Sequence, residues 1–123
     1  MNKDDIMRAL YFRKEAYFVD MFGKVKSNIT TLYNDRNNCT SQKHIEKWLA
    51  INDMLNVAYY LNQSWYPDWE NTNQEKYTIV LKNGKFEVQQ IDIPSSIVYF
   101  ASPQLAEQAI EILGEESLKI IFL

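Results

Sequence analysis

The sequence has very little cysteine, histidine, glycine or proline. It contains 1 cysteine and 1 histidine, with 3 glycines and 3 prolines in 123 residues. The single cysteine, Cys39, cannot form an intramolecular disulfide, so nothing in the sequence points to an oxidising compartment. With 46% hydrophobic and 24% charged residues, the composition excludes the disordered and fibrous classes. It predicts one globular domain that folds alone.

A signal peptide and a membrane span are also missing. Residues Met1 to Asp5 carry two acids instead of a basic and then apolar segment, and no apolar run approaches the roughly 18 residues of a span. We therefore expect a cytoplasmic protein. The net charge is −3, and the mildly basic first half and acidic second half lack the strong basic footprint of most nucleic-acid-binding domains.

The first part of the sequence, about residues 1–62, predicts a helical hairpin. Five apolar residues follow each other at helical spacings of four and three: Phe18, Phe22, Val25, Ile29 and Leu32. They predict a first helix over residues 4–34, which Gly23 can divide into two. Turn-forming residues at 34–41 predict a loop, with Thr40 or Ser41 capping a second helix over 42–62. That helix carries a broad apolar stripe from Ile45 to Leu61.

The second part, about residues 63–123, predicts a sheet with one helix. Alternating residues 77–82, the pair Asn83-Gly84 and the extended segment 85–93 predict a β-hairpin, with a bulge near Gln89-Gln90 where the apolar phase slips. The apolar run 97–100 predicts a third, covered strand. Ser102-Pro103 and Gly114 bracket a helix, and residues 118–123 fit either a short helix or a strand. The expected fold class is α+β, with a three-stranded antiparallel sheet.

The most unusual segment holds five of the seventeen aromatic residues within positions 59–69. Large amphipathic rings are enriched at protein-recognition hot spots, so we select Trp65, Tyr66, Asp68 and Trp69 as candidate partner-binding residues. The alternative is that these rings cover the junction between the helical and β parts. Base stacking is a third interpretation, but Asp68 and Glu70 would repel phosphates near the rings.

Five basic residues of the predicted first helix form a second candidate surface: Arg8, Arg13, Lys14, Lys24 and Lys26. They could contact RNA or steer an acidic protein partner towards the chain. The alternative is an ordinary solvated helix face.

The residue types that carry catalysis give no supported site. Cys39 and His44 are the only pair that suggests a nucleophile and its base, and no third group is available to orient them. Glu107 and Glu111 stand one helical turn apart on a predicted solvent face. We predict no enzyme activity, no metal site and no cofactor.

The second half of the sequence resembles small uncharacterised proteins of phages, prophages and other mobile elements of Bacteroidetes-like hosts. The resemblance rests on residues 61–69 (LNQSWYPDW), 75–77 (EKY), 98–102 (VYFAS) and 105–110 (LAEQAI). It covers about half of the chain, and the N-terminal part has no counterpart in it. What it implies is a setting in a bacterial host cell and not a reaction.

Small phage accessory proteins without catalytic residues often bind and block a host enzyme, and several classes of anti-CRISPR protein have this size and composition. The resemblance therefore implies a counter-defence inhibitor of a host antiphage component, such as an RNA-guided nuclease of the type VI kind or its guide-RNA complex. Two alternatives stay open: a nucleic-acid-binding accessory protein, and a protein that binds a small ligand such as a nucleotide signal.

Overall fold

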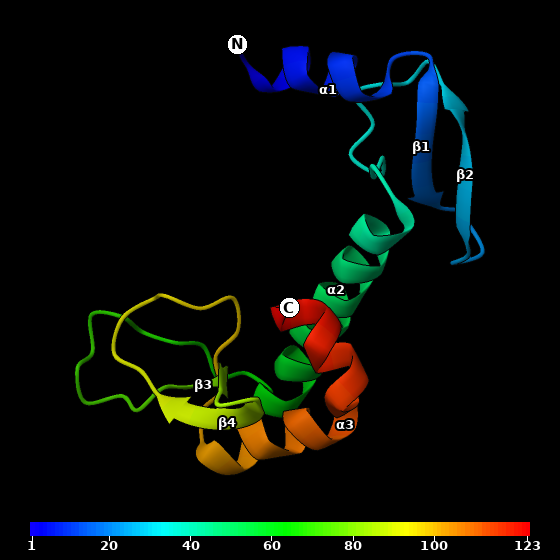
Figure 1. The fold of residues 1–123 in the computed structure, drawn as a ribbon. Helices are drawn as coiled ribbons and strands as arrows, with labels where there is room; N and C mark the ends of the chain where they lie inside the picture. The colour runs from blue at the N-terminus through cyan, green and yellow to red at the C-terminus, as the bar shows by residue number, and fades with distance from the viewer. The chain divides into compact units, whose positions relative to one another are not determined.

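The computed structural model describes residues 1–123 and shows an α+β protein with three helices and two separate two-stranded antiparallel sheets (Figure 1). The elements in chain order are α1 (Lys3–Tyr11), β1 (Lys14–Val19), β2 (Val25–Thr30), α2 (Gln42–Asn62), β3 (Tyr77–Lys82), β4 (Lys85–Gln90) and α3 (Pro103–Phe122). The chain divides into two compact units, residues 1–48 and 49–123, and the division falls within α2.

The predicted first helix over residues 4–34 is wrong beyond its first turns. Helix α1 begins after Asn2, which forms a capping box with Asp5, and it ends at Tyr11. Arg13 then adopts a φ of 58°, a left-handed conformation that no helix continues through. The sequence 14–30 forms a β-hairpin in place of the rest of the predicted helix (Figure 1). The predicted pair of antiparallel helices is therefore absent.

The β1–β2 hairpin pairs Lys14 with Thr30 at one end and Val19 with Val25 at the other. In the turn, the carboxylate of Asp20 accepts hydrogen bonds from the backbone N–H groups of Phe22 and Lys24, at 2.8 and 2.9 Å. Gly23 has a φ of +78°, so this glycine belongs to a turn and does not kink a helix. The apolar residues spaced by four and three are divided among two strands, a turn and a loop.

A small core holds the first unit together. Its buried side chains are Tyr11, Ala16, Cys39 and Ile45. Backbone hydrogen bonds of 2.9 and 2.7 Å between Tyr17 and Cys39 attach the predicted loop to the free edge of β1. Residues 31–41 contain no helix or strand, which confirms the loop predicted at 34–41 and extends it into the end of the predicted first helix.

Helix α2 has the predicted bounds. The Ser41 hydroxyl accepts a hydrogen bond from the His44 N–H at 3.1 Å, which confirms this residue as the cap. The buried face of α2 differs from the predicted apolar stripe. Two residues of the stripe, Trp48 and Leu55, are 41% and 44% exposed, whereas Met54 is fully buried.

The β3–β4 hairpin is confirmed, with φ of 53° at Asn83 and 76° at Gly84, as a type I′ turn requires. Pairing is regular from Tyr77–Gln90 to Lys82–Lys85, so the predicted bulge is wrong. The strand ends at Gln90, and the change of apolar phase falls in the loop that follows, where Ile93 is 59% exposed.

The predicted third strand is also wrong. Residues 97–100 contribute one isolated bridge, between Tyr77 and Phe100, and no ladder. Side chains fix this segment instead: the Thr78 hydroxyl donates to the Val98 carbonyl at 2.7 Å, and the Tyr99 hydroxyl bonds to the backbone of Ser96. Val98 and Phe100 are buried in the core, whereas Ile97 is 52% exposed, so the prediction that the run is covered on both faces is also wrong.

Helix α3 begins at the predicted cap Ser102, with Pro103 in its first position. Gly114 breaks the helix with φ 82° and ψ 158°, and helical structure resumes to Phe122, so the tail is a helix and not a strand. The core of the second unit combines α2, β3, the 98–100 segment and α3: Ala50, Met54, Ala58, Ile79, Val98, Phe100, Ala106, Ala109 and Ile121. None of the three helices combines the length and the apolar character that a membrane span requires.

Candidate functional site

The loop between α2 and β3 carries the predicted aromatic residues, and Gln74 gives it a defined shape. The Gln74 side-chain oxygen accepts from the Asp68 N–H at 2.6 Å, and its amide nitrogen donates to the Tyr66 carbonyl at 3.0 Å. The Asp68 carboxylate accepts from the Glu70 N–H at 3.1 Å. Asp68 is exposed, and its carboxylate shapes a turn of the loop.

Trp69 packs inside this loop. Its ring lies edge-on to Tyr99, with ring centres 4.8 Å apart, and the Lys76 ammonium lies 5.1 Å from its centre. Lys76 is only 3% exposed and donates to the carbonyls of Asn71 and Gln74. Trp69 therefore packs against Tyr99 and Lys76, both from the second part of the chain.

Tyr66 points outward and meets a residue of α2. It is 63% exposed, whereas its neighbour Trp65 is partly buried. A side-chain hydrogen bond with Tyr59 raises the pKa of Tyr66 above its usual value of 10.0. Tyr59 lies near the end of α2, so Tyr66 faces the last turns of this helix.

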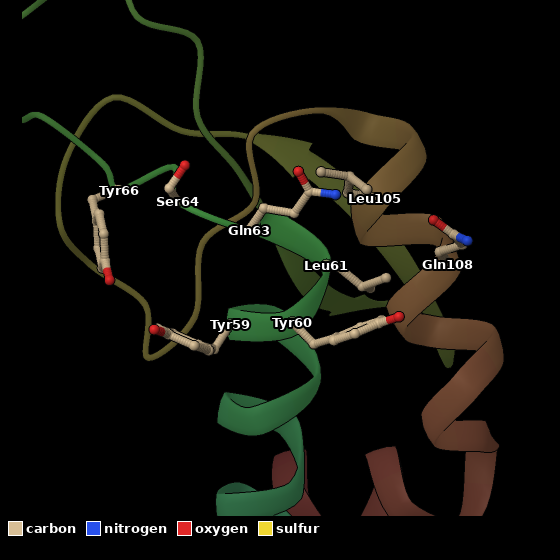
Figure 2. Close-up of a pocket in the computed structure, with 8 residues that line it drawn as sticks. All are labelled: Tyr59, Tyr60, Leu61, Gln63, Ser64, Tyr66, Leu105 and Gln108. Carbon is tan, nitrogen blue, oxygen red and sulfur yellow. The ribbon is translucent and has the colours of Figure 1, made fainter.

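Tyr59, Tyr60 and Tyr66 line a groove of about 630 Å³ between the end of α2, the following loop and α3 (Figure 2). The other lining residues are Leu61, Gln63, Ser64, Leu105 and Gln108. Figure 2 shows Tyr59 directed towards Tyr66 and Tyr60 directed towards α3. Tyr59 and Tyr60 are 66% and 79% exposed. We refer to this set of eight residues as the tyrosine groove.

The lining of the tyrosine groove is uncharged. Its tyrosine rings offer large apolar faces, and their hydroxyls, the two glutamines and the serine offer hydrogen bonds. Tyrosine and serine dominate the binding loops of antibodies for the same reason: rigid contact area combined with adaptable hydrogen bonding. Such a lining is suited to another protein's surface.

The five basic candidates do not share a helix face. They lie on α1 (Arg8), after it (Arg13), on β1 (Lys14), in the turn (Lys24) and on β2 (Lys26), and all are exposed.

Three of these five are engaged within the first unit. The Arg8 guanidinium donates to the Tyr33 hydroxyl at 2.9 Å and lies 4.6 Å from the centre of that ring. Arg13 lies 5.2 Å from the centre of the Phe12 ring. Lys14 donates to the Ala9 carbonyl at 2.9 Å. Arg8, Arg13 and Lys14 therefore make contacts with other residues of the first unit.

The remaining candidates do not converge on a reactive centre. Cys39 is buried, and this burial raises the pKa of its thiol. Nδ1 of His44 accepts a hydrogen bond from the Thr40 N–H at 3.0 Å. This nitrogen is therefore engaged in a local contact at the start of α2. No group of three or more histidine, cysteine, aspartate or glutamate side chains could hold a metal ion.

Tyr59 and Tyr60 belong to the aromatic segment but are not among the predicted site residues. A weak signal was available, because adjacent residues of a helix lie about 100° apart around its axis and Ala58 already falls on the predicted apolar stripe. Leu105 and Gln108 gave no such signal, since only the folded chain brings α3 to the groove. Comparisons with protein-family models, with curated proteins and with solved structures each find no match.

Proposed function

We propose that the chain is a phage-type accessory protein that binds a host protein through the tyrosine groove and inhibits it. The observation that carries the proposal is the group of three tyrosines, each more than 60% exposed, around one uncharged groove. Exposed aromatic residues that flank a concave surface are the usual anchors of protein recognition.

The groove favours a protein over the two alternative ligands. A nucleotide signal or a nucleic acid brings phosphates, and proteins bind phosphates with cationic side chains or helix N-termini. The groove is lined by tyrosine, glutamine, serine and leucine, and it offers no cation. The α3 residue at its N-terminal end, Leu105, already donates its N–H to the Ser102 hydroxyl. Its chemistry is complementary to side chains and peptide groups.

The class of target follows from the resemblance of residues 61–110 to phage and prophage proteins. We assign to the chain an anti-CRISPR role, the inhibition of an RNA-guided nuclease or its guide-RNA complex. Binding without chemistry is sufficient for such inhibition, because a partner that occupies an essential surface of an enzyme blocks it.

The test is affinity capture with the tagged chain from a lysate of a host that carries antiphage systems, after nuclease treatment. The captured protein is identified by mass spectrometry, purified, and assayed for activity with and without the chain. We expect one stoichiometric host protein whose activity falls when the chain is added. The variant Y59A/Y60A/Y66A should lose both capture and inhibition, because it removes the exposed rings without touching a buried side chain.

Phe22→Ala is the matched control. Phe22 is 80% exposed in the β1–β2 turn, so this variant removes an aromatic ring of similar exposure from another place. It should capture and inhibit like the unaltered chain. Equal capture by the tyrosine variant, or loss of capture with Phe22→Ala alone, would contradict the assignment to the groove. Nucleic acid as the only captured molecule in untreated lysate would contradict a protein target.

A further inference from the structure

The charge of the second unit indicates what kind of protein segment the groove accepts. Residues 49–123 contain four lysines and ten aspartates or glutamates, a net charge of −6. Lys76 is buried in its loop, and Lys119 forms an ion pair with Glu115 at 3.3 Å. The remaining lysines, Lys82 and Lys85, flank the β3–β4 turn. The surface of this unit is therefore strongly acidic.

Two of these acids adjoin the tyrosine groove. Glu107 and Glu111 line a neighbouring cavity of about 380 Å³ along the first turns of α3, and Gln108 lines both cavities. Both carboxylates are exposed, and neither forms an ion pair. Gln108 therefore adjoins the uncharged tyrosines on one side and two unpaired carboxylates of α3 on the other.

From this arrangement, and resting on the proposed function, we infer that the groove binds an arginine-bearing segment of the partner protein. A guanidinium stacks on tyrosine faces and bonds carboxylates with two parallel N–H groups, so it matches both halves of this surface. The chain itself shows the first of these contacts, since the Arg8 guanidinium lies 4.6 Å from the centre of the Tyr33 ring. Lysine makes both contacts less well than arginine, because its ammonium is a compact and strongly hydrated charge.

Occupation of an arginine-bearing segment explains how the chain inhibits its partner. Proteins that handle nucleic acid bind its phosphates with arginine-rich and lysine-rich surfaces. A chain that occupies such a segment competes directly with the nucleic acid for it. The inhibited activity should then recover as the concentration of the nucleic-acid substrate is raised.

The test uses the full-length chain, isotope-labelled for amide NMR, and the peptide Gly-Arg-Leu-Gly-Arg-Leu-Gly as the probe. A peptide with citrulline in place of both arginines is the control, since it keeps the shape and removes the charge. We expect the arginine peptide to shift the amide signals of Tyr59, Tyr60, Tyr66 and Gln108. Binding should weaken at least about fivefold when salt rises from about 50 to about 300 mM, because exposed charges are screened.

Matched variants separate the local carboxylates from the overall charge. E107Q/E111Q should weaken peptide binding about fivefold or more, as expected when charges at a binding surface are neutralised. E87Q/E116Q removes the same charge from exposed positions outside both cavities and should leave binding within about twofold.

Three results would overturn the inference: no shift at the groove, equal binding of the citrulline peptide, or equal effects of the two variant pairs. The proposed function is tested separately with the captured host protein. If Y59A/Y60A/Y66A abolishes its capture while E107Q/E111Q and salt have no effect, the groove binds a protein without arginine recognition. In that case the proposed function stands and the inference fails.

Discussion

The ammonium group of Lys76 lies 5.1 Å from the centre of the Trp69 ring, inside the loop that leads into β3. This lysine is 3% exposed and has no carboxylate partner; it donates to the carbonyls of Asn71 and Gln74, at 3.2 and 3.0 Å. A buried cation held only by carbonyls and a ring is unusual, because burial of a charge is costly unless its donors are satisfied. The order of the loop therefore depends on this residue.

Lys76→Met should lower the free energy of unfolding by about 1–3 kcal/mol, because it leaves two loop carbonyls without their donor. Urea denaturation followed by tryptophan fluorescence measures the change. Lys82→Met removes an exposed lysine at the end of β3 and should change stability by less than about 0.5 kcal/mol. Equal midpoints for the two variants would show that the buried lysine has no structural role.

Trp69→Ala and Tyr66→Ala should have opposite effects on stability and binding. Trp69 is partly buried against Tyr99, so its loss should destabilise the chain by about 2–4 kcal/mol. Tyr66 is 63% exposed, so its loss should cost less than about 1 kcal/mol while weakening partner binding. Thermal unfolding and binding of the captured partner measure the two effects. A stable Trp69→Ala variant that no longer binds would instead identify Trp69 as an anchor.

Gly114→Ala should destabilise α3 by about 1–3 kcal/mol, because φ 82° with ψ 158° is a conformation that essentially only glycine adopts. The cost is conformational and not steric, since no atom lies within 4 Å of an added Cβ. Gly84→Ala provides a comparison at φ +76° in the hairpin turn, where the left-handed conformation costs about 1 kcal/mol. Denaturant midpoints of the two variants test whether Gly114→Ala destabilises the chain more than Gly84→Ala. A neutral Gly114→Ala would mean that α3 straightens at no cost.

The first unit should lose stability in alkaline solution. Burial raises the pKa of the Cys39 thiol above 9.0, and burial followed by the nearby Cys39 raises the pKa of the Tyr11 hydroxyl above 10.0. A raised pKa means that the native state retains its proton where the unfolded chain has already lost it. The contribution of both groups to the free energy of unfolding is therefore complete below about pH 8. It is lost progressively as the pH rises through the native pKa values.

Equilibrium unfolding between about pH 7 and about pH 11 measures this loss. Tyr11→Phe and Cys39→Ala remove the titrating groups and should each flatten the pH dependence, whatever their effect on absolute stability. Cys39 should also resist a thiol reagent at neutral pH until the chain is unfolded, because it is 3% exposed and reacts only as the thiolate. Rapid labelling of the native protein would contradict both expectations.

Local signals predicted the elements that depend on backbone chemistry. Asn83-Gly84 gave the hairpin, and Ser41 and Ser102-Pro103 gave the starts of two helices, because each signal satisfies a specific φ or an unpaired N–H group. Periodicity failed at residues 14–30. Apolar residues at spacings of four and three also fit two strands joined by a turn, and the β-branched and aromatic residues there favour strands.

The candidate site could be predicted only in part. The aromatic segment was found from composition, but the roles of its members depend on tertiary packing: Trp69 meets Tyr99 from thirty positions further along the chain, and Tyr66 meets Tyr59. The apolar run 97–100 misled in a related way. Burial was predicted for all four residues and holds only for Val98 and Phe100, since Ile97 is 52% exposed. Burial of these two does not distinguish a strand from a loop that hydrogen bonds of Thr78 and Tyr99 hold in place.

Both sheets of the protein join only strands that follow each other directly along the chain. Such contacts close short loops, so the entropy lost before each pairing forms is small. Proteins rich in contacts between near neighbours in sequence are the fast folders among small domains. During synthesis the β1–β2 hairpin can form while residues 49–123 are still being made.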